Sequence, residues 1–453
     1  MAACKVLSYR AVIMSHILLK MRRRRSLICI AAIIIFLLSS SLSSADAFTC
    51  TSTSRSVNQH HNNAPPSSRC QATSLPDLNY GLTDKEFHTW LQTQVQTAPG
   101  RNTYNATYED CLSAIVNWRK RYRGNPSLWK RIFKKDRVIK EMIESAPVIE
   151  FVKRAVLEHH DDHNDDEDDA TNKKKFTIID LCSGKGYLSM FLSEILPKEK
   201  VDKFILVDKA WAIANKKTTT ELKPHHMNWD HIYGSTTIST TDGTEESSSS
   251  YFTTWPIPLY TSKQDLKDSC NQRQMTKHFF NKIDNGPIII LAVHLCGTLS
   301  LKAIDMFNNN PKSVKLFALK PCCLPQMVYA NRGDVFRIGQ HEFDARDVCS
   351  NGQFTKGNWD GPPRWHLQPR FDTWADHLFK GIDVGGSSSS SSTTLEQQDG
   401  SEEEEDNGYR VSVSSHDGVK VKDDIVIQVD GGFQNTYIFA EREPITPAIW
   451  EEE

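Results

Sequence analysis

Four short apolar runs recur along the central part of the chain, and longer segments separate them. They read FTIIDL (176–181), KFILVD (203–208), IIILAVHL (288–295) and VKLFALK (314–320). Apolar runs of this length are typical of strands buried on both faces of a parallel sheet. Helical patterns follow the first and third runs, at 187–196 and 299–307. The pattern therefore predicts an α/β fold with a parallel central sheet.

The last part of the chain predicts a different strand arrangement. DDIVIQV (423–429) and NTYIFAERE (435–443) flank the turn DGGFQ. Two such runs separated by a glycine-containing turn are expected to pair as an antiparallel hairpin. A closing hairpin distinguishes this chain from a simple doubly wound nucleotide-binding sheet.

A helical pattern precedes the strands, and segments of biased composition mark the boundaries. Thr83 is the expected N-cap ahead of DKEFHTWL, and Pro147 is expected to interrupt a later helix. The acidic run HHDDHNDDEDDA cannot bury apolar surface and is interpreted as a linker. We expect a basic helical region at 76–157, the linker at 158–175, and a larger domain at 176–445 with low-complexity loops inserted at 234–250 and 385–408.

The first 75 residues have the composition of targeting segments. A cationic stretch, an apolar run and a small-residue site ending at Ala47 predict a signal peptide at 1–47. Residues 48–75 are rich in Ser and Thr and contain no acidic residue, as expected of a transit peptide. The joined segments, with Phe48 at the junction, resemble the bipartite presequence of algae with secondary plastids. We expect a plastid protein without stable membrane association after processing; the alternative is the secretory pathway.

Total charge does not favour a nucleic-acid partner, because 54 basic residues face 56 acidic ones. A local cluster does. The aromatic residues Trp118, Tyr122, Trp129 and Phe133 interleave with ten basic residues: Arg119, Lys120, Arg121, Arg123, Lys130, Arg131, Lys134, Lys135, Arg137 and Lys140. Phosphate contacts and stacking surfaces are what RNA binding requires. Alternatively, the aromatic residues at helical spacing form a core beneath a solvated basic face.

A glycine turn follows the first predicted strand. Asp180 leads into Cys182, Gly184 and Gly186, so the backbone can approach a ligand at the N-terminus of the next helix. Asp208 ends the second predicted strand, about twenty residues further on, where a carboxylate can accept hydrogen bonds from a ribose. The two features together predict a nucleotide-containing ligand.

DLCSGKG, followed by the carboxylate at Asp208, resembles the motifs of Class I S-adenosylmethionine-dependent methyltransferases, although Cys182 replaces their first glycine. The resemblance covers roughly residues 176–443 and implies a Rossmann-like sheet with S-adenosyl-L-methionine as cofactor. It places Asp180 at the methionine end, Asp208 at the ribose and Cys182 beneath the cofactor. Asp265 is the candidate for the adenine amino group; Gln264 and Asp268 compete with it.

DLCSGKGYLS, VHLCGTLS and KPCCLP are most similar to the branch that contains the eukaryotic acceptor-stem tRNA 2'-O-methyltransferases. The Cys/His zinc fingers of those enzymes are not found in this sequence, so the tRNA substrate is not assured by the resemblance. The resemblance implies transfer of a methyl group to RNA, either tRNA or rRNA. The alternatives are a protein or small-molecule methyltransferase, a non-catalytic RNA-binding module, and a redox-sensing or zinc protein.

His294 ends the predicted fourth strand, where enzymes of this fold place residues that face the transferred methyl group. It is the candidate catalytic base; the alternative is a histidine that only bonds to backbone. Strand alternation places His294 and Cys296 on one face. Cys322 and Cys323 could add thiols, but adjacent strand residues point to opposite faces, so no metal ligand set is assigned.

A long segment, 326–381, separates the fifth predicted strand from the closing hairpin. Its position after a strand end favours a substrate-facing lid, to which Trp359, Arg364, Trp365 and Arg370 would contribute. The alternative is a local hydrophobic cap. The pattern does not predict an oligomeric state.

Overall fold

The computed structural model describes residues 81–158, 174–212, 227–234, 250–281, 286–355, 358–361, 364–385, 392–396, 410–415, 418–425 and 435–442. The predicted signal and transit peptides, nearly all of the acidic linker and most of both insertions lie outside these residues. None of the described helices is long and apolar enough to span a membrane.

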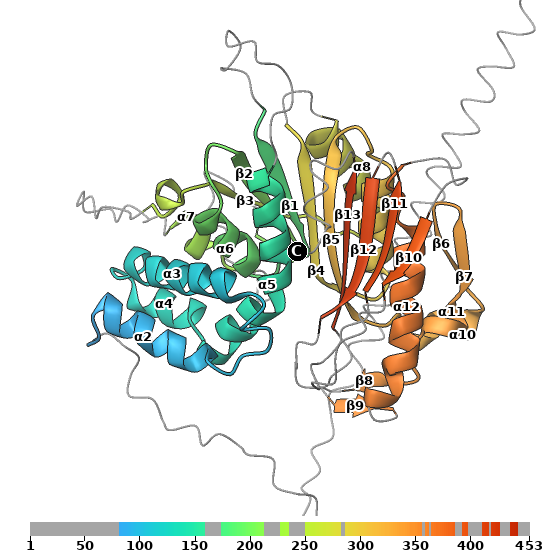
Figure 1. Ribbon diagram of the computed structural model, residues 1–453, viewed down its shortest axis with the longest axis horizontal. Helices are drawn as coiled ribbons and strands as arrows, with labels where there is room; N and C mark the ends of the chain where they lie inside the picture. Colours follow the sequence, from blue (N-terminus) through green and yellow to red (C-terminus); the bar gives the residue numbers. More distant parts are fainter. Residues whose placement is uncertain are drawn as a thin grey trace, which may run out of the picture. The chain divides into compact units, whose positions relative to one another are not determined.

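A nine-stranded sheet forms the centre of the protein, with the order β10-β11-β12-β13-β5-β4-β1-β2-β3 (Figure 1). Five strands are parallel: β1 (Phe176–Leu181), β2 (Val201–Val207), β3 (Leu259–Ser262), β4 (Ile288–Cys296) and β5 (Val314–Cys323). The antiparallel strand β13 (Thr436–Arg442) lies between β5 and β12 (Gly418–Asp424). The predicted Rossmann-like α/β fold with a closing antiparallel pair is confirmed.

The first strand of the closing pair begins earlier than expected. β12 spans 418–424 rather than 423–429, because Val419 and Val421 are the residues that bury beside β13. The intervening Lys420 donates hydrogen bonds to the carbonyls of Phe379 and Ile382. Two further strands, β11 (Arg410–Ser415) and β10 (Ser392–Glu396), extend the sheet, so part of the predicted loop at 385–408 is a strand.

Four helices precede the sheet: α2 (Asp84–Val95), α3 (Asn105–Arg121), α4 (Pro126–Ile132) and α5 (Lys135–Glu158). Thr83 caps α2 in a capping box with Glu86, as predicted. The expected interruption at Pro147 was wrong, because α5 continues through this residue. Buried side chains before and after Pro147, such as Met142 and Val152, hold the helix together despite the missing amide donor.

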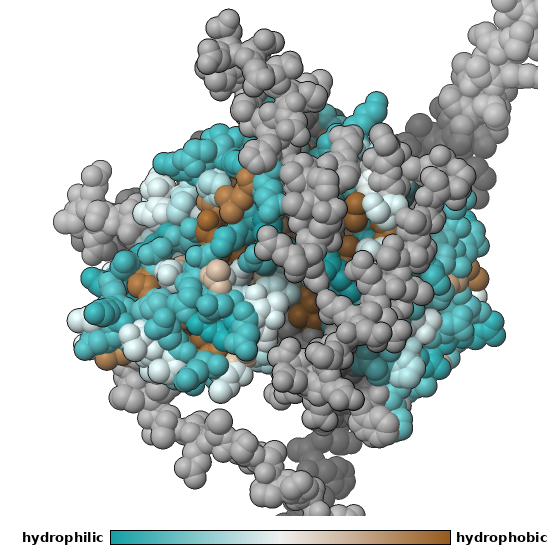
Figure 2. All heavy atoms as spheres, in the orientation of Figure 1, coloured by the Kyte–Doolittle hydropathy of each residue, from teal (hydrophilic) through white to brown (hydrophobic). Residues whose placement is uncertain are grey.

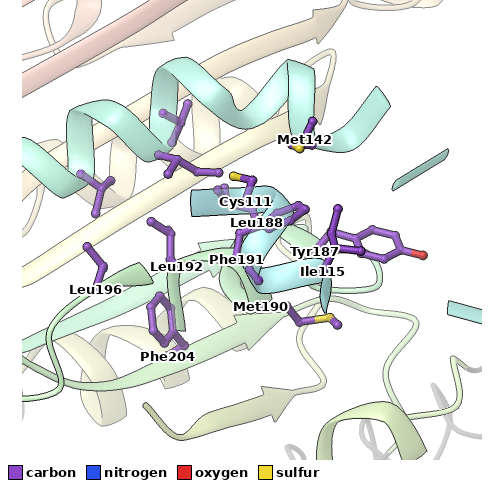
Figure 3. Packing of buried hydrophobic residues seen from close by; sticks show 14 of the residues in the cluster. Cys111, Ile115, Met142, Tyr187, Leu188, Met190, Phe191, Leu192, Leu196 and Phe204 are labelled. Atoms are coloured by element: carbon purple, nitrogen blue, oxygen red, sulfur yellow. The ribbon is translucent and has the colours of Figure 1, made fainter. Parts of the chain in front are cut away.

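Each face of the sheet carries its own apolar core, so the part of the chain that contains the sheet has three layers. Along β1, Ile178 belongs to the core beneath α3, α5 and α6 (Tyr187–Ile195), whereas Ile179 belongs to the core of the opposite face. Figure 3 shows side chains of α6 between those of α3, α5 and β2, where Phe191 and Phe204 are fully buried. The alternation follows from the period of two along a strand.

The opposite face is covered by α8 (Ser269–Met275), α9 (Leu299–Asn308) and α12 (Gln368–Gly381), of which α12 lies across the sheet from α5 in Figure 1. Between β5 and α12 the chain forms compact elements rather than one long loop. They are α10 (Met327–Arg332), β6 (Val335–Ile338), β7 (His341–Asp344), α11 (Ala345–Val348), β8 (Gln353–Thr355), β9 (Asn358–Asp360) and η4 (Arg364–Leu367). The remaining short helices are α7 (Asp230–Tyr233), η2 (Phe252–Thr254) and η3 (Thr276–Phe280).

Candidate functional site

A cavity of about 730 Å³ lies where the parallel strands end. Cys182 follows β1, Asp208 follows β2, Asp265 follows β3, and Cys296 ends β4; all four line the cavity. Ligand sites of open α/β sheets are found at this edge, and small-molecule pockets typically measure about 300–1,000 Å³. The cavity therefore has the position and the size of a cofactor or substrate site.

The glycine turn after β1 adopts the conformation that its sequence predicts, including at the cysteine. Cys182 has φ +56°, Gly184 +53° and Gly186 +83°. The left-handed conformation costs an L-residue about 1–2 kcal/mol, so Cys182 stands in a position that favours glycine. A Cβ on Gly186 would lie 2.3 Å from Cδ2 of Leu206 on β2. Glycine at 186 thus permits close packing of the turn on the second strand.

Asp208 joins the two loops that the sequence predicted to form the ligand site. Its Oδ2 accepts a hydrogen bond from the Gly184 amide at 3.2 Å, and its Oδ1 accepts one from the Ala210 amide at 2.8 Å. The carboxylate is half-buried in the cavity wall. The structure therefore brings Asp208 and Cys182 to one cavity, whereas Gly184 and Gly186 support the turn without being among the lining residues.

Asp180 lies below the turn and is not among the lining residues. It is 2% exposed, and its Oδ2 accepts a hydrogen bond from the Ser189 hydroxyl at 2.8 Å. Burial raises the pKa of Asp180 to about 7, although the Ser189 hydrogen bond opposes this shift. The Asp180 carboxyl therefore changes between its protonated and ionised forms near neutral pH.

Two of the three candidates for the adenine group lie at the cavity, and the third does not. Asp265 and Gln264 line the cavity. Asp268 instead caps α8, because its Oδ1 accepts a hydrogen bond from the Cys270 amide at 2.8 Å. Asp265 also accepts the Lys267 amide at 3.0 Å, which fixes the loop after β3.

The predicted alternation of His294 and Cys296 was wrong. The pairing of β4 with β5 shifts register between Val293 and Leu295 and again before Cys296, and His294 has φ +64°. Cys296 lines the cavity, whereas Nε2 of His294 lies 3.3 Å from Oε2 of Glu141 and 3.4 Å from Oε2 of Glu144. A register irregularity at the strand end breaks the period of two on which the prediction depended.

Glu141, Glu144 and Lys320 were missed by the sequence analysis. Burial raises the pKa of Glu141, but the hydrogen bond and charge of His294 outweigh burial and hold this pKa below its ordinary value. Nζ of Lys320, almost fully buried, lies 3.7 Å from Oε1 of Glu144, and burial lowers the pKa of this lysine. The available signal was two carboxylates at i and i+3, on one face of a helix.

Three cysteine sulfurs meet at the ends of β4 and β5. Sγ of Cys322 lies 3.4 Å from Sγ of Cys296 and 3.6 Å from Sγ of Cys323. The expectation that Cys322 and Cys323 point to opposite faces was therefore wrong, because the strand ends at Cys323 and alternation no longer holds. Hydrogen bonds from the neighbouring thiols lower the pKa of Cys296 and raise that of Cys322, which favours one thiolate at Cys296.

The aromatic residues of the basic helical region do not provide a stacking surface. Trp118, Tyr122, Trp129 and Phe133 are at most 3% exposed and belong to the core beneath α3 and α5. This outcome agrees with the alternative interpretation of their helical spacing.

Several basic residues in this region are engaged in internal contacts. Arg119 pairs with Asp84 at 2.9 Å, and Arg121 pairs with the almost fully buried Glu194 at 2.5 Å. Lys120, Arg123, Lys130, Lys134 and Lys140 have exposed side chains. Figure 2 shows a mainly hydrophilic surface over these helices.

The segment expected to form a lid contributes to the cavity, but through other residues. Met327, Val328 and Tyr329 of α10, together with Leu367, line it. Arg370 does not face a substrate, because its guanidinium donates hydrogen bonds to the carbonyls of Arg346 and Cys349 at 2.7 and 3.0 Å. The side chains of Trp359, Arg364 and Trp365 lie outside the described residues.

Residues 144–329 match a family model described as a methyltransferase domain. This match supports a methyltransferase. The match begins within α5 and ends in α10, so it contains Glu144, the glycine turn, all five parallel strands and the three clustered cysteines. No curated protein matches the chain.

Proposed function

We propose that this methyltransferase domain binds S-adenosylmethionine and transfers its methyl group to RNA, either tRNA or rRNA, in a plastid. The observation that carries the cofactor assignment is the position of Asp208. Its carboxylate is fixed at the cavity wall by two backbone amides, one of them from the glycine turn. A fixed carboxylate after the second strand is suited to accept hydrogen bonds from a ribose.

The other lining residues fit the remaining parts of this cofactor. Asp265 offers a carboxylate for the adenine amino group, and Cys182 offers a small, weakly polar side chain at the turn. Asp180 does not line the cavity but supports the turn from its buried side, and its pKa of about 7 allows it to hold or release a proton near neutral pH. S-adenosylmethionine, when bound, supplies an electrophilic methyl group; the protein must hold an acceptor in line with it and remove a proton.

His294 is the residue that we assign to proton removal. Glu141 and Glu144 hold its Nε2, as a carboxylate orients the histidine of a hydrolase triad. Its side chain is 36% exposed, so the ring is accessible from solvent. Nδ1 is then the nitrogen that would accept the proton of a hydroxyl or amine. A His294→Ala protein that binds cofactor normally but methylates at the wild-type rate would contradict this role.

Titration calorimetry of the purified protein with S-adenosylmethionine tests the cofactor assignment. We expect micromolar affinity, about −8 kcal/mol, and a loss of more than about 1.4 kcal/mol in Asp208→Ala. Asp208→Asn keeps one of the two oxygens, so it retains one backbone hydrogen bond and shows how much of the loss in Asp208→Ala follows from the turn. Asp202→Ala is the matched control, because Asp202 is an exposed carboxylate at the other end of the same strand. Wild-type protein that does not bind would leave a non-catalytic scaffold.

The RNA assignment is supported by the family resemblance and by the exposed lysines on the helical region. Reversing Lys120, Lys130 and Lys134 to Glu should weaken RNA retention on filters by at least about tenfold at low salt. The control is a second triple variant, in which the exposed residues Lys198, Lys312 and Lys380 are changed to Glu. Equal RNA binding by the two triple variants would remove this surface from the proposal and favour a protein or small-molecule acceptor.

The plastid assignment rests on the composition of residues 1–75. Residues 1–80 fused to a fluorescent protein should direct it into the plastid of an alga with a secondary plastid. Fluorescence confined to the secretory pathway would contradict the assignment. A fusion that begins at residue 48 is the control, because it lacks the predicted signal peptide and should not enter the endoplasmic reticulum.

A further inference from the structure

The ends of β4 and β5 bring three thiols to one point of the cavity wall. Cys296 comes from β4, and Cys322 and Cys323 come from β5; all three line the cavity. Their sulfur atoms lie within 4.8 Å of one another. Among the described residues, these are the three whose ligand atoms are arranged as a candidate metal cluster.

The spacing of these sulfurs is that of ligands around one metal ion. A tetrahedral zinc ion binds thiolates at about 2.3 Å, which places the sulfurs about 3.8 Å apart. The measured separations of 3.4 Å and 3.6 Å require only a small outward movement to receive the ion. A disulfide would instead require two of the sulfurs to approach to about 2.05 Å.

We propose that Cys296, Cys322 and Cys323 bind a zinc ion as three thiolates, with the fourth coordination position open to the cavity. Soft thiolate ligands and a tetrahedral arrangement favour zinc over magnesium or calcium. Zinc binding displaces the remaining thiol protons. Three thiolates around a divalent ion leave one negative charge, and Lys267, in the same cavity wall, supplies a neighbouring positive charge.

The open position distinguishes this site from a closed structural zinc site. His294 does not complete the ligand set, because its Nε2 lies between the carboxylates of Glu141 and Glu144. An oxygen or nitrogen atom that enters the cavity can therefore become the fourth ligand, and zinc would make a bound hydroxyl more acidic. This use of the ion to activate an acceptor rests on the proposed function, whereas the metal site itself does not.

Metal analysis of the full-length protein, purified under reducing conditions and equilibrated with zinc, tests the proposal. We expect about one zinc ion per chain in the wild type. Cys296→Ser should retain less than about one fifth of it, because two thiolates seldom hold zinc through purification. Cys270→Ser is the matched control and should retain all of it, since Cys270 is an exposed cysteine on α8.

Cobalt substitution gives a readout that does not depend on activity. The reduced, metal-free wild type should develop thiolate-to-cobalt charge-transfer bands and the visible bands of a tetrahedral site, and Cys296→Ser should lose most of this intensity. Circular dichroism of each variant excludes unfolding as the cause; Cys296 is exposed, so its substitution leaves the core intact.

Wild-type protein with less than about 0.2 zinc ions per chain and no cobalt bands would overturn the proposal. So would equal zinc in wild type and Cys296→Ser. A Cys296–Cys322 disulfide in protein purified with reductant, detected by mass spectrometry, would identify a redox pair instead. Zinc binding without S-adenosylmethionine binding would contradict the proposed function alone.

Discussion

His294 Nε2 lies 3.3 Å from Oε2 of Glu141, although one residue lies near the end of the fourth parallel strand and the other belongs to the helix before the first strand. The contact joins α5 to the edge of the sheet at which the cavity lies. It also couples the charge of Glu141 to that of the imidazole. The consequence is a measurable dependence of stability on pH.

The pKa of Glu141 is lower in the folded protein than its ordinary value of 4.5. Glu141 therefore stabilises the fold above about pH 4.5, and this contribution is lost as the pH falls through the lower folded pKa. His294→Ala removes the main causes of the lowered pKa. The free energy of unfolding can be measured with urea at pH values between about 6 and 3.5. We expect its decrease over this range to be about 1 kcal/mol smaller in His294→Ala than in the wild type. His278 is an exposed histidine on η3 and provides the control. His278→Ala should show the same decrease in stability at acid pH as the wild type.

Asp180 has the opposite effect in a different pH range. Its folded pKa of about 7 lies above the ordinary value of 3.8, so the folded state holds more protons between these values and stability falls as the pH rises. Asp180→Asn should remove this fall, which amounts to up to about 4 kcal/mol between pH 4 and 8. Unfolding midpoints across this range check the slope. Ser189→Ala, which removes the opposing hydrogen bond, should raise the folded pKa and extend the fall to higher pH; a flat wild-type profile would contradict the assignment.

The two glycines of the turn form a matched pair. Both have positive φ, so substitution by alanine strains the backbone at either position. Only Gly186→Ala would also place its Cβ against Leu206; a Cβ on Gly184 meets no atom within 4 Å. We expect Gly186→Ala to lower the free energy of unfolding by about 1–3 kcal/mol more than Gly184→Ala. Denaturant unfolding of both variants measures the difference, and equal losses would show that Leu206 moves aside.

We expect a smaller and a β-branched replacement of Cys182 to differ in their effect on stability. Cys182→Gly should be neutral or stabilising by up to about 1 kcal/mol, because relief of the left-handed conformation offsets the added freedom of the unfolded chain. Cys182→Val should cost at least about 1 kcal/mol more than the glycine variant, because a β-branched residue tolerates this conformation poorly. Thermal unfolding of both proteins checks the order, and a more stable valine variant would contradict it.

The glycine turn and Asp208 were predictable because they belong to one strand–turn–helix–strand unit. Residue spacing within that unit determines which side chains reach the carboxyl edge of the sheet. The parallel strands were predictable for a similar reason, since each is a continuous apolar run. β12 was misplaced because its alternating valines and lysines give a weaker signal than the apolar run that follows.

The contacts of His294 and the clustering of the cysteines were not predictable from alternation. Both depend on the register shift at the end of β4 and on the end of β5, which a period of two cannot represent. The burial of Trp118 and Trp129 was equally undetermined, because helical spacing of aromatic residues is the same for a core and for a stacking surface.

The position of β13 has a consequence for folding during synthesis. β13 is made after β10, β11 and β12, yet it pairs with β5 on one side and β12 on the other. Until residue 442 has left the ribosome, the outer edge of β5 has no partner, and the strands β12, β11 and β10 cannot join the sheet. An unpaired apolar strand edge attracts other nascent chains. The emerging polypeptide therefore exposes the edge of β5 to other chains until β13 has been made.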